Sequence, residues 1–288
     1  MNTLGQQLKD YLVLMRLNKP IGIFLLLWPT LWALWFAAGG PPSAHVLLVF
    51  VAGTVLMRSA GCAINDFADR DFDPQVARTK DRPIAAGRVP PEAAVRLFVA
   101  VSLIAFGLLS SLRNVPALLL SVPGALLAAS YPFAKRFHHL PQAHLGVAFS
   151  WGIPMAYAAV RGHVDWPQAG LLMAANLCWV MAYDTFYAMA DRADDARAGV
   201  KSSAILFGRA DRTITALLQG AALVLLAVAG RRQGVWYAAG LALAAAFALY
   251  QQWLIRHREP QACLRAFLNN NAFGAAIFAG LLLDDGLS

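Results

Sequence analysis

Apolar residues in this chain occur in long runs that few charges interrupt. A transmembrane helix needs about 20 mostly apolar residues. Nine stretches meet this requirement and are separated by polar or Gly- and Pro-containing segments. They cover residues 20–38, 45–63, 93–112, 115–131, 142–160, 167–187, 213–230, 235–254 and 267–283. The pattern therefore predicts an all-α, polytopic membrane protein with about nine transmembrane helices.

The N-terminal segment has a different pattern, in which charged residues interrupt the apolar ones. Helical spacing over residues 3–18 gives one apolar face, made of Leu4, Leu8, Leu12 and Met15. No small-residue cleavage site follows a clean hydrophobic core, so the segment is not a signal peptide. We expect residues 1–19 to form an amphipathic helix on the membrane surface and residues 20–288 to form the transmembrane domain.

Composition agrees with this pattern. The chain is 59% hydrophobic and only 14% charged, whereas soluble proteins carry about 25% charged residues. Disordered, coiled-coil and collagen-like proteins are excluded, and three cysteines without a CxxC pair predict neither a disulfide scaffold nor a zinc site. The net charge of +8 is not accompanied by an aromatic-basic recognition motif, so we expect no nucleic-acid partner.

The basic residues predict the orientation of the chain. Of 24 Lys and Arg residues, 18 lie in the N-terminus and in alternate loops, four lie in the opposite loops, and Arg58 and Arg96 fall inside predicted spans. Lys and Arg are concentrated in cytoplasmic loops of membrane proteins. We therefore expect an inner-membrane protein whose N-terminus is cytoplasmic.

Nine of the 16 acidic residues form two clusters, each beginning at the predicted cytoplasmic end of a span. The first cluster consists of Asp66, Asp69, Asp71, Asp73 and Asp81, and the second of Asp184, Asp191, Asp194 and Asp195. Four spans separate the clusters, which indicates a weak internal duplication with parallel orientation. Such a duplication would allow both clusters to face one cavity on the cytoplasmic side.

The spacing of these residues suggests a metal site. Asn65, Asp69 and Asp73 stand four residues apart, as do Asp191 and Asp195, so each set lines one face if the segments are helical. Like charges at that spacing destabilise a helix, and solvation of a loop leaves the spacing unexplained. Oxygen ligands suit Mg²⁺, which binds a few carboxylates, waters and a substrate phosphate. We therefore expect Mg²⁺ here rather than zinc.

Basic residues near the acidic clusters complete a site for a polyphosphate, although each also fits an anchor for topology. They are Arg70, Lys80, Arg82, Lys135, Arg136 and Lys201. Arg offers bidentate contacts to phosphate and Lys offers a point charge. A metal, cations and a membrane cavity together suggest a lipid diphosphate that loses diphosphate from an allylic carbon, with the developing charge stabilised by the site.

The motifs resemble those of the UbiA superfamily of intramembrane prenyltransferases, and most closely the branch that prenylates 4-hydroxybenzoate. They are Asn65-Asp66-x-x-Asp69-x-x-x-Asp73, Tyr183-Asp184-Thr185-x-Tyr187, Asp191-x-x-Asp194-Asp195, Lys201-Ser202, Arg16-x-x-Lys19-Pro20-Ile21-Gly22, Tyr131-Pro132-Phe133-x-Lys135-Arg136 and Leu140-Pro141-Gln142. The resemblance covers nearly the whole chain.

The resemblance implies nine helices around a central cavity in a bacterial inner membrane, with both aspartate motifs above the cavity. It implies Mg²⁺-dependent transfer of a long polyprenyl chain from all-trans polyprenyl diphosphate to the carbon ortho to the hydroxyl of 4-hydroxybenzoate, in ubiquinone synthesis. Asn65, Asp69 and Asp73 would serve one Mg²⁺ and Asp191 and Asp195 another. Tyr187 stands one turn before Asp191, so the second motif offers only two carboxylates at helical spacing, and the division of ligands stays open.

Two further residues have candidate roles. Arg58 lies seven residues before Asn65, about 10 Å deeper along a helix, where an unpaired charge is costly. It would meet the acceptor carboxylate, steady the first motif, or form an internal ion pair with an aspartate. Asp184 would support the site or accept a proton.

Two other functions fit part of the pattern. A related prenyltransferase with a naphthoate, homogentisate or haem acceptor shares the motifs. A cation-coupled transporter would also hold intramembrane charges, but its sites would normally lie near the middle of the bilayer, whereas these charges gather at one face.

Overall fold

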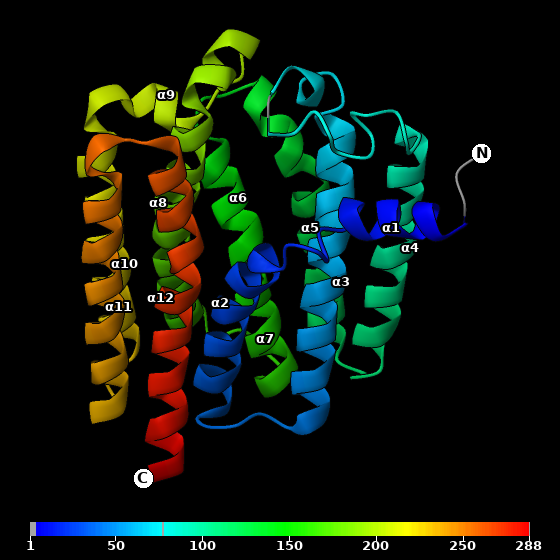
Figure 1. The fold of residues 1–288 in the computed structure, drawn as a ribbon. Helices are drawn as coiled ribbons and strands as arrows, with labels where there is room; N and C mark the ends of the chain where they lie inside the picture. Colours follow the sequence, from blue (N-terminus) through cyan, green and yellow to red (C-terminus); the bar gives the residue numbers. More distant parts are fainter. Residues whose placement is uncertain (1–3, 77, 288) are drawn as a thin grey trace.

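The computed structural model describes residues 4–76 and 78–287, and every regular element within them is helical (Figure 1). The α-helices are α1 (Leu4–Leu14), α2 (Ile21–Ala38), α3 (Ala44–Ala68), α4 (Pro91–Ser110), α5 (Val115–Ser130), α6 (Pro141–Ser150), α7 (Gly152–Arg161), α8 (Trp166–Ala198), α9 (Ser203–Phe207), α10 (Asp211–Ala229), α11 (Val235–Leu254) and α12 (Pro260–Leu287). Short 3-10 helices are η1 (Asp73–Gln75), η2 (Tyr131–Arg136), η3 (Gly208–Ala210) and η4 (Ile255–His257).

Nine helical segments of the described chain are long and apolar enough to cross a membrane. This number confirms the prediction from apolar run lengths. Four of the segments are composite: α5 with η2 forms Val115–Arg136, α6 with α7 forms Pro141–Arg161, α9 with η3 and α10 forms Ser203–Ala229, and α11 with η4 forms Val235–His257. The chain is therefore an all-α, multi-span membrane protein.

Helix α8 is much longer than a bilayer requires. It has 33 residues, which gives about 50 Å at 1.5 Å per residue, against a hydrocarbon core of about 30 Å. Its C-terminal end, which carries the second acidic cluster, lies at the same end of the bundle as the C-terminal end of α3 (Figure 1). The excess length of α8 thus carries Asp191 and Asp195 to the level of the first cluster.

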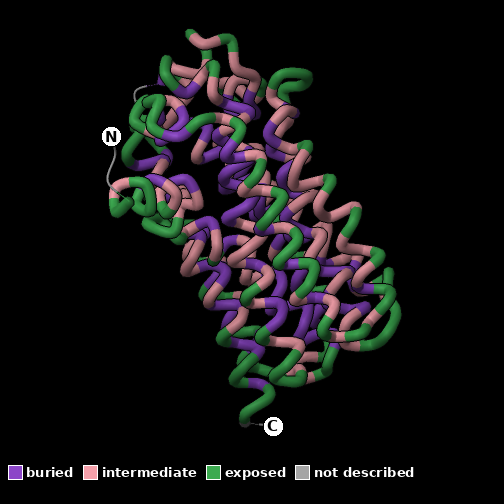
Figure 2. Tube along the Cα trace, turned by 90° about the vertical axis from the view of Figure 1, so that its right-hand side faces the viewer, coloured by how far each residue is buried: buried purple, intermediate pink, exposed green. Residues whose placement is uncertain are grey.

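Aromatic residues form much of the buried interior that holds the helices in place. Figure 2 shows buried residues along the length of the bundle. Trp179 of α8 stacks on Phe273 of α12, with ring centroids 5.2 Å apart, and its indole N–H donates to Asn270 Oδ1 at 2.7 Å. A polar group inside a membrane needs such a partner, so these contacts fix α8 against α12 without leaving the indole unsatisfied.

Helix α1 runs across the upright helices (Figure 1) and packs on α3. Its Leu14 is fully buried in a small cluster with Ile84 and Ala63, whereas Leu4 and Leu8 are 83% and 62% exposed. Two ion pairs hold the segment: Asp10 with Arg88 at 3.0 Å and Arg16 with Asp66 at 2.7 Å. The exposed leucines form the apolar face that an interfacial helix needs.

The expected helical spacing of the first motif is wrong, because α3 ends before Asp69. Asp69 is the C-terminal cap of α3, and Asp73 begins the 3-10 helix η1. Pro74 disfavours the α conformation at Asp73, and carboxylates one turn apart repel each other within a helix. The second motif does follow its helical spacing, because α8 continues to Ala198 and keeps Asp191 and Asp195 one turn apart on one face.

Candidate active site

Arg82 joins the aspartates of the first motif. Its Nη1 lies 2.8 Å from Asp73 Oδ2, 3.2 Å from Asp66 Oδ1 and 3.9 Å from Asp69 Oδ2. Burial raises the pKa of Asp73 more than the nearby Arg82 lowers it. The carboxylates raise the pKa of Arg82, although its burial opposes them. A single guanidinium therefore brings together three carboxylates that do not share a helix face.

Lys135 and Tyr131, both from η2, contact the same motif from another side. Lys135 Nζ lies 2.5 Å from Asp69 Oδ1, and the Tyr131 hydroxyl donates to Asn65 Oδ1 at 3.1 Å. Asn65 Nδ2 donates in turn to Asp69 Oδ2 at 3.1 Å. The segment η2 thus provides a cation for Asp69 and orients the side chain of Asn65, so that Lys135 lies where the sequence predicted a cation.

Arg78 links the loop after the first motif to the second motif. Its Nε and Nη2 donate to Asp191 Oδ1 and Oδ2 at 3.0 and 2.5 Å, and its guanidinium lies 4.5 Å from the centre of the Tyr187 ring. The loop that follows the first motif is therefore joined to the second motif through Arg78.

Sequence reasoning did not single out Arg78, which it treated only as one of the loop cations. The neighbouring Lys80, which it did select, is exposed, as Arg78 is, but among the described residues only Arg78 pairs with α8 from this loop. The two residues have the same charge and lie in the same loop, and only the path of the loop decides which one meets α8. No signal in the spacing distinguishes them.

Arg136 and Arg70 hold the end of α3 and not the central carboxylates. Arg136 Nη2 donates to the carbonyl of Ala68, the last residue of α3, and lies 3.8 Å from Asp71. Arg70 lies 3.9 Å from Asp71 and stacks on Phe67. Cations near a helix C-terminus stabilise its unpaired carbonyl groups. Both arginines border the motif.

Lys201, which was expected at the diphosphate site, makes its hydrogen bond away from the aspartates. Its Nζ donates to the carbonyl of Phe137 at 3.1 Å. This contact ties the segment after α8 to the segment after η2. Of the six predicted cations, Arg82 and Lys135 therefore contact the aspartates of the first motif most directly.

A second charged cluster, which sequence reasoning missed, supports the end of α8. The Asp211 side chain has no exposed surface; it pairs with Arg192 of α8 and lies 2.8 Å from Nη2 of Arg258. Hydrogen bonding to Asp211 raises the pKa of Arg258. Arg192 follows Asp191 directly, so the cluster fixes the helical turn that carries the second motif.

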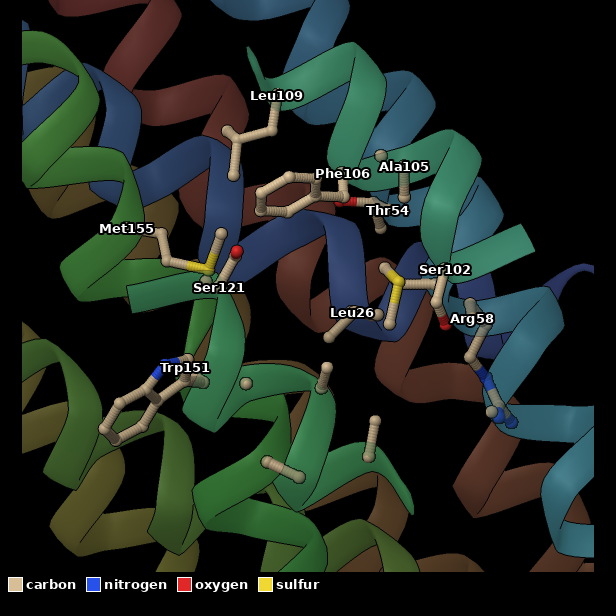
Figure 3. Close-up of a pocket in the computed structure, with 18 of the residues that line it drawn as sticks. Leu26, Thr54, Arg58, Ser102, Ala105, Phe106, Leu109, Ser121, Trp151 and Met155 are labelled. Carbon is tan, nitrogen blue, oxygen red and sulfur yellow. The ribbon is translucent and has the colours of Figure 1, made fainter. Parts of the chain in front are cut away.

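Arg58 lies deeper, in the wall of a cavity of about 410 Å³ that is lined by residues of the helices from α2 to α7 (Figure 3). Among the ion pairs of the described residues, none involves Arg58, and its Nε is buried without a hydrogen-bond partner. The guanidinium lies 5.7 Å from the centre of the Phe149 ring. The internal ion pair with an aspartate, one of the expected alternatives, is therefore not observed.

Asp184 lies on α8 two turns before Asp191. It interacts electrostatically with Arg58 of α3 and with Gln142 of α6. Gln142 Oε1 in turn accepts the backbone N–H of Ser203 at 3.1 Å. Asp184 is thus oriented by α6 and by the start of α9, on the side of α8 that faces Arg58.

The oxygen atoms of the first motif fit an open site for a hard cation. Among the residues that the structure describes, no three His, Cys, Asp or Glu side chains converge into a closed metal cage. Asp69 and Asp73 nevertheless approach the same nitrogen of Arg82. Mg²⁺ binds through one or two carboxylates together with waters and substrate phosphates. This donor set suits Mg²⁺ better than zinc.

Known proteins are similar in sequence to nearly the whole chain. A "4-hydroxybenzoate octaprenyltransferase" of Nitrosococcus oceani is 59% identical over 280 residues, which cover 96% of this chain and 98% of that protein. A protein of the same name from Thiobacillus denitrificans is 57% identical over 98% of this chain and 96% of its own length.

Solved structures share the fold. The apo structure of a UbiA homolog from Aeropyrum pernix K1 has a TM-score of 0.79 and 28% identity, covering 91% of this chain and 97% of that one. A UbiA homolog from Archaeoglobus fulgidus bound to GPP and Mg²⁺ has a TM-score of 0.71, 17% identity and coverages of 93% and 99%. The model of the UbiA prenyltransferase family matches residues 26–277. With nine membrane-length helices among the residues that the structure describes, two neighbouring aspartate motifs and relatives this close over nearly its full length, the chain belongs to the UbiA prenyltransferase family.

Proposed function

We propose that this protein transfers the polyprenyl group of all-trans polyprenyl diphosphate to the ring carbon ortho to the hydroxyl of 4-hydroxybenzoate, releasing diphosphate, as a step of ubiquinone synthesis. The observation that carries the proposal is the 59% identity, over nearly the full length of both chains, with a 4-hydroxybenzoate octaprenyltransferase. The arrangement of charges around the two motifs supports the same reaction.

The diphosphate head group would bind between the two motifs. Asp69, Asp73, Asp191 and Asp195, with Asn65, would hold Mg²⁺. When bound, Mg²⁺ stabilises the negative charge that develops on the departing diphosphate. Arg82 offers a planar donor group to phosphate oxygens, and Lys135 offers a point charge. Both already lie at the aspartates, so they are positioned before the substrate arrives, which is how electrostatic catalysis is most effective.

The prenyl chain would occupy the apolar cavity below the motifs. Residues that line it extend along α3 from Val49 to Gly61, which is about 18 Å at 1.5 Å per residue. Leu109, Phe106 and Leu126 line it from α4 and α5. Such a cavity leaves the allylic carbon at its cytoplasmic end and keeps water from the cation that forms there.

The acceptor would bind at Arg58, with its carboxylate on the guanidinium and its ring toward the first motif. Arg58 is about 10 Å deeper than Asn65, which leaves room for the ring between them. Arg58 lines the cavity and takes part in none of the ion pairs of the described residues, which supports this role. Asp184, which interacts electrostatically with Arg58, would accept the proton that the ring releases. The ring of Tyr187, which lies against the guanidinium of Arg78, would form part of the wall of the site.

The location follows from the charges. We propose a bacterial inner membrane location with the N-terminus and both motifs on the cytoplasmic side, because 18 of 24 basic residues lie in the N-terminus and the alternate loops, and basic residues concentrate in cytoplasmic loops. Residues 1–19 would lie at the membrane surface, with the exposed leucines of α1 in the lipid, and residues 20–288 would form the catalytic domain.

The test is a prenylation assay with the full chain in liposomes, using polyprenyl diphosphate, labelled 4-hydroxybenzoate and Mg²⁺. Label should pass into the lipid phase only when Mg²⁺ is present. Asp69→Ala and Asp191→Ala should abolish transfer, whereas the matched control Asp71→Ala, which removes a carboxylate that is 62% exposed, should retain it. Transfer to dihydroxynaphthoate or homogentisate in preference to 4-hydroxybenzoate would contradict the proposed acceptor.

A further inference from the structure

Helix α1 packs against the loop that carries Arg82. This loop, residues 78–89, lies between η1 and α4 and is called the Arg82 loop below. Leu14 of α1 is fully buried in one apolar cluster with Ile84 and Val89 of the loop. The N-terminal helix, which lies outside the transmembrane bundle in sequence, therefore shares a small core with a loop of the candidate active site.

Arg88 holds the backbone on both sides of Arg82. Its Nη2 donates to the carbonyl of Asp81 at 2.9 Å, and its backbone N–H donates to the carbonyl of Pro83 at 2.8 Å. Gly87, with a φ of 69°, provides the left-handed turn that brings Arg88 back to Pro83. Because the residues before and after Arg82 are both held, the backbone of Arg82 has little freedom to move.

Asp10 of α1 holds Arg88 in turn. Its Oδ1 accepts from Arg88 Nε at 3.0 Å, and its side chain is only 5% exposed. Aspartate is almost never buried without a partner, and here the partner belongs to the Arg82 loop. The buried residues of α1 are Asp10 and Leu14, so both of them face this loop.

The end of the same segment reaches the carboxylate that Arg82 also contacts. Arg16, two residues after α1, lies 2.7 Å from Asp66 Oδ1, and Arg82 Nη1 lies 3.2 Å from the same oxygen. Arg16 has a φ of 57°, which is uncommon for a residue with a side chain. The N-terminal segment thus holds a partner of Arg82 as well as the loop that carries it.

We propose that Asp10 and Arg88 are positioning residues for Arg82, so that α1 sets the geometry of the diphosphate site. Asp10 orients Arg88, Arg88 fixes the backbone on either side of Arg82, and Arg82 then meets the carboxylates of the first motif. Donors that are held in place before the substrate arrives stabilise developing charge most effectively. The role of Arg82 toward diphosphate rests on the proposed function, whereas the contacts that run from Asp10 to Arg82 do not.

The test compares Asp10→Asn with Asp165→Asn in the full-length protein in liposomes. Asp165 forms a matched ion pair with Arg161 at 3.2 Å and caps the N-terminus of α8, at the opposite end of that helix from the second motif. Asp10→Asn should raise the KM for polyprenyl diphosphate about tenfold, because even a small misplacement of a binding group is costly, and leave the KM for 4-hydroxybenzoate unchanged. Calorimetric binding of inorganic diphosphate with Mg²⁺ should weaken by a similar factor. Asp165→Asn should change none of these values.

A double-mutant cycle with Arg88→Gln gives a second measurement. If Asp10 acts through Arg88, the double variant should bind diphosphate no worse than Arg88→Gln alone, and Asp10→Glu, which keeps the charge, should recover most of the affinity. A lower melting temperature in Asp10→Asn with an unchanged KM for polyprenyl diphosphate would show that the pair only stabilises the fold, and it overturns the proposal, as does an equal loss in Asp165→Asn. If the unchanged protein does not prenylate 4-hydroxybenzoate, the proposed function fails, and the calorimetric comparison then decides the positioning role alone.

Discussion

Gly22→Ala tests whether Arg58 must lie where the structure places it. Gly22 is on the first turn of α2, and the guanidinium of Arg58 lies directly against it. A Cβ at this position would be 2.3 Å from Arg58 Nε and 2.6 Å from Nη2. Ordinary contact begins at 3.4 Å, so the guanidinium must retreat by about 1 Å. The glycine in the Pro20-Ile21-Gly22 segment thus makes room for a charge on a neighbouring helix.

The expected effect is a loss of acceptor binding with little loss of stability. Misplacing a binding group by about 1 Å can lower the rate by about 100-fold, which corresponds to about 2.7 kcal/mol of transition-state stabilisation. Alanine in a helix is itself more favourable than glycine by about 0.5–1 kcal/mol, which offsets part of the strain. We therefore expect kcat/KM for 4-hydroxybenzoate to fall by about 10- to 100-fold and the melting temperature to change little.

The assay measures initial rates against 4-hydroxybenzoate at saturating polyprenyl diphosphate. Gly170→Ala is the matched control, because Gly170 lies within α8 and a Cβ there would meet nothing within 4 Å. A double-mutant cycle with Arg58→Ala identifies the cause. If Gly22 acts through Arg58, the double variant should be no worse than Arg58→Ala alone. An unchanged acceptor KM in Gly22→Ala, or losses that simply add, would refute the reasoning.

Three further variants test the charges around the site. Arg78→Ala removes the two hydrogen bonds to Asp191, so kcat should fall about tenfold or more and the rate should require more Mg²⁺; an unchanged Mg²⁺ titration would show that Arg78 does not support the second motif. Asp211→Ala leaves two partly exposed arginines without their shared carboxylate, and the free energy of unfolding should fall by about 1–3 kcal/mol, measured by denaturation in detergent. Asp284→Ala removes the acceptor for three backbone N–H groups at the start of α11; it should lower the melting temperature through a loss of about 1–3 kcal/mol while kcat stays the same.

The aspartate motifs show how far a local pattern can be extended. The spacing of Asp191 and Asp195 was sufficient to place them on one face, because α8 is a continuous helix there. The same spacing gave a wrong prediction at Asp69 and Asp73, because α3 ends at Ala68 and Asp73, followed by Pro74, begins a 3-10 helix. Helical spacing is informative only where the helix continues, and a proline directly after the last motif residue was the signal against it.

The number of membrane helices was readable from the sequence, because the length of an apolar run is a local property that the thickness of the bilayer selects. The residue types of the site were readable as well, since few charges occur in so apolar a chain and nine of the 16 acidic ones gather in two segments. Only the tertiary structure decided that Arg78, rather than Lys80, reaches α8. It alone placed the guanidinium of Arg58 against Gly22, because that meeting depends on how two helices align in depth, and no local pattern encodes the distance between residues 36 positions apart.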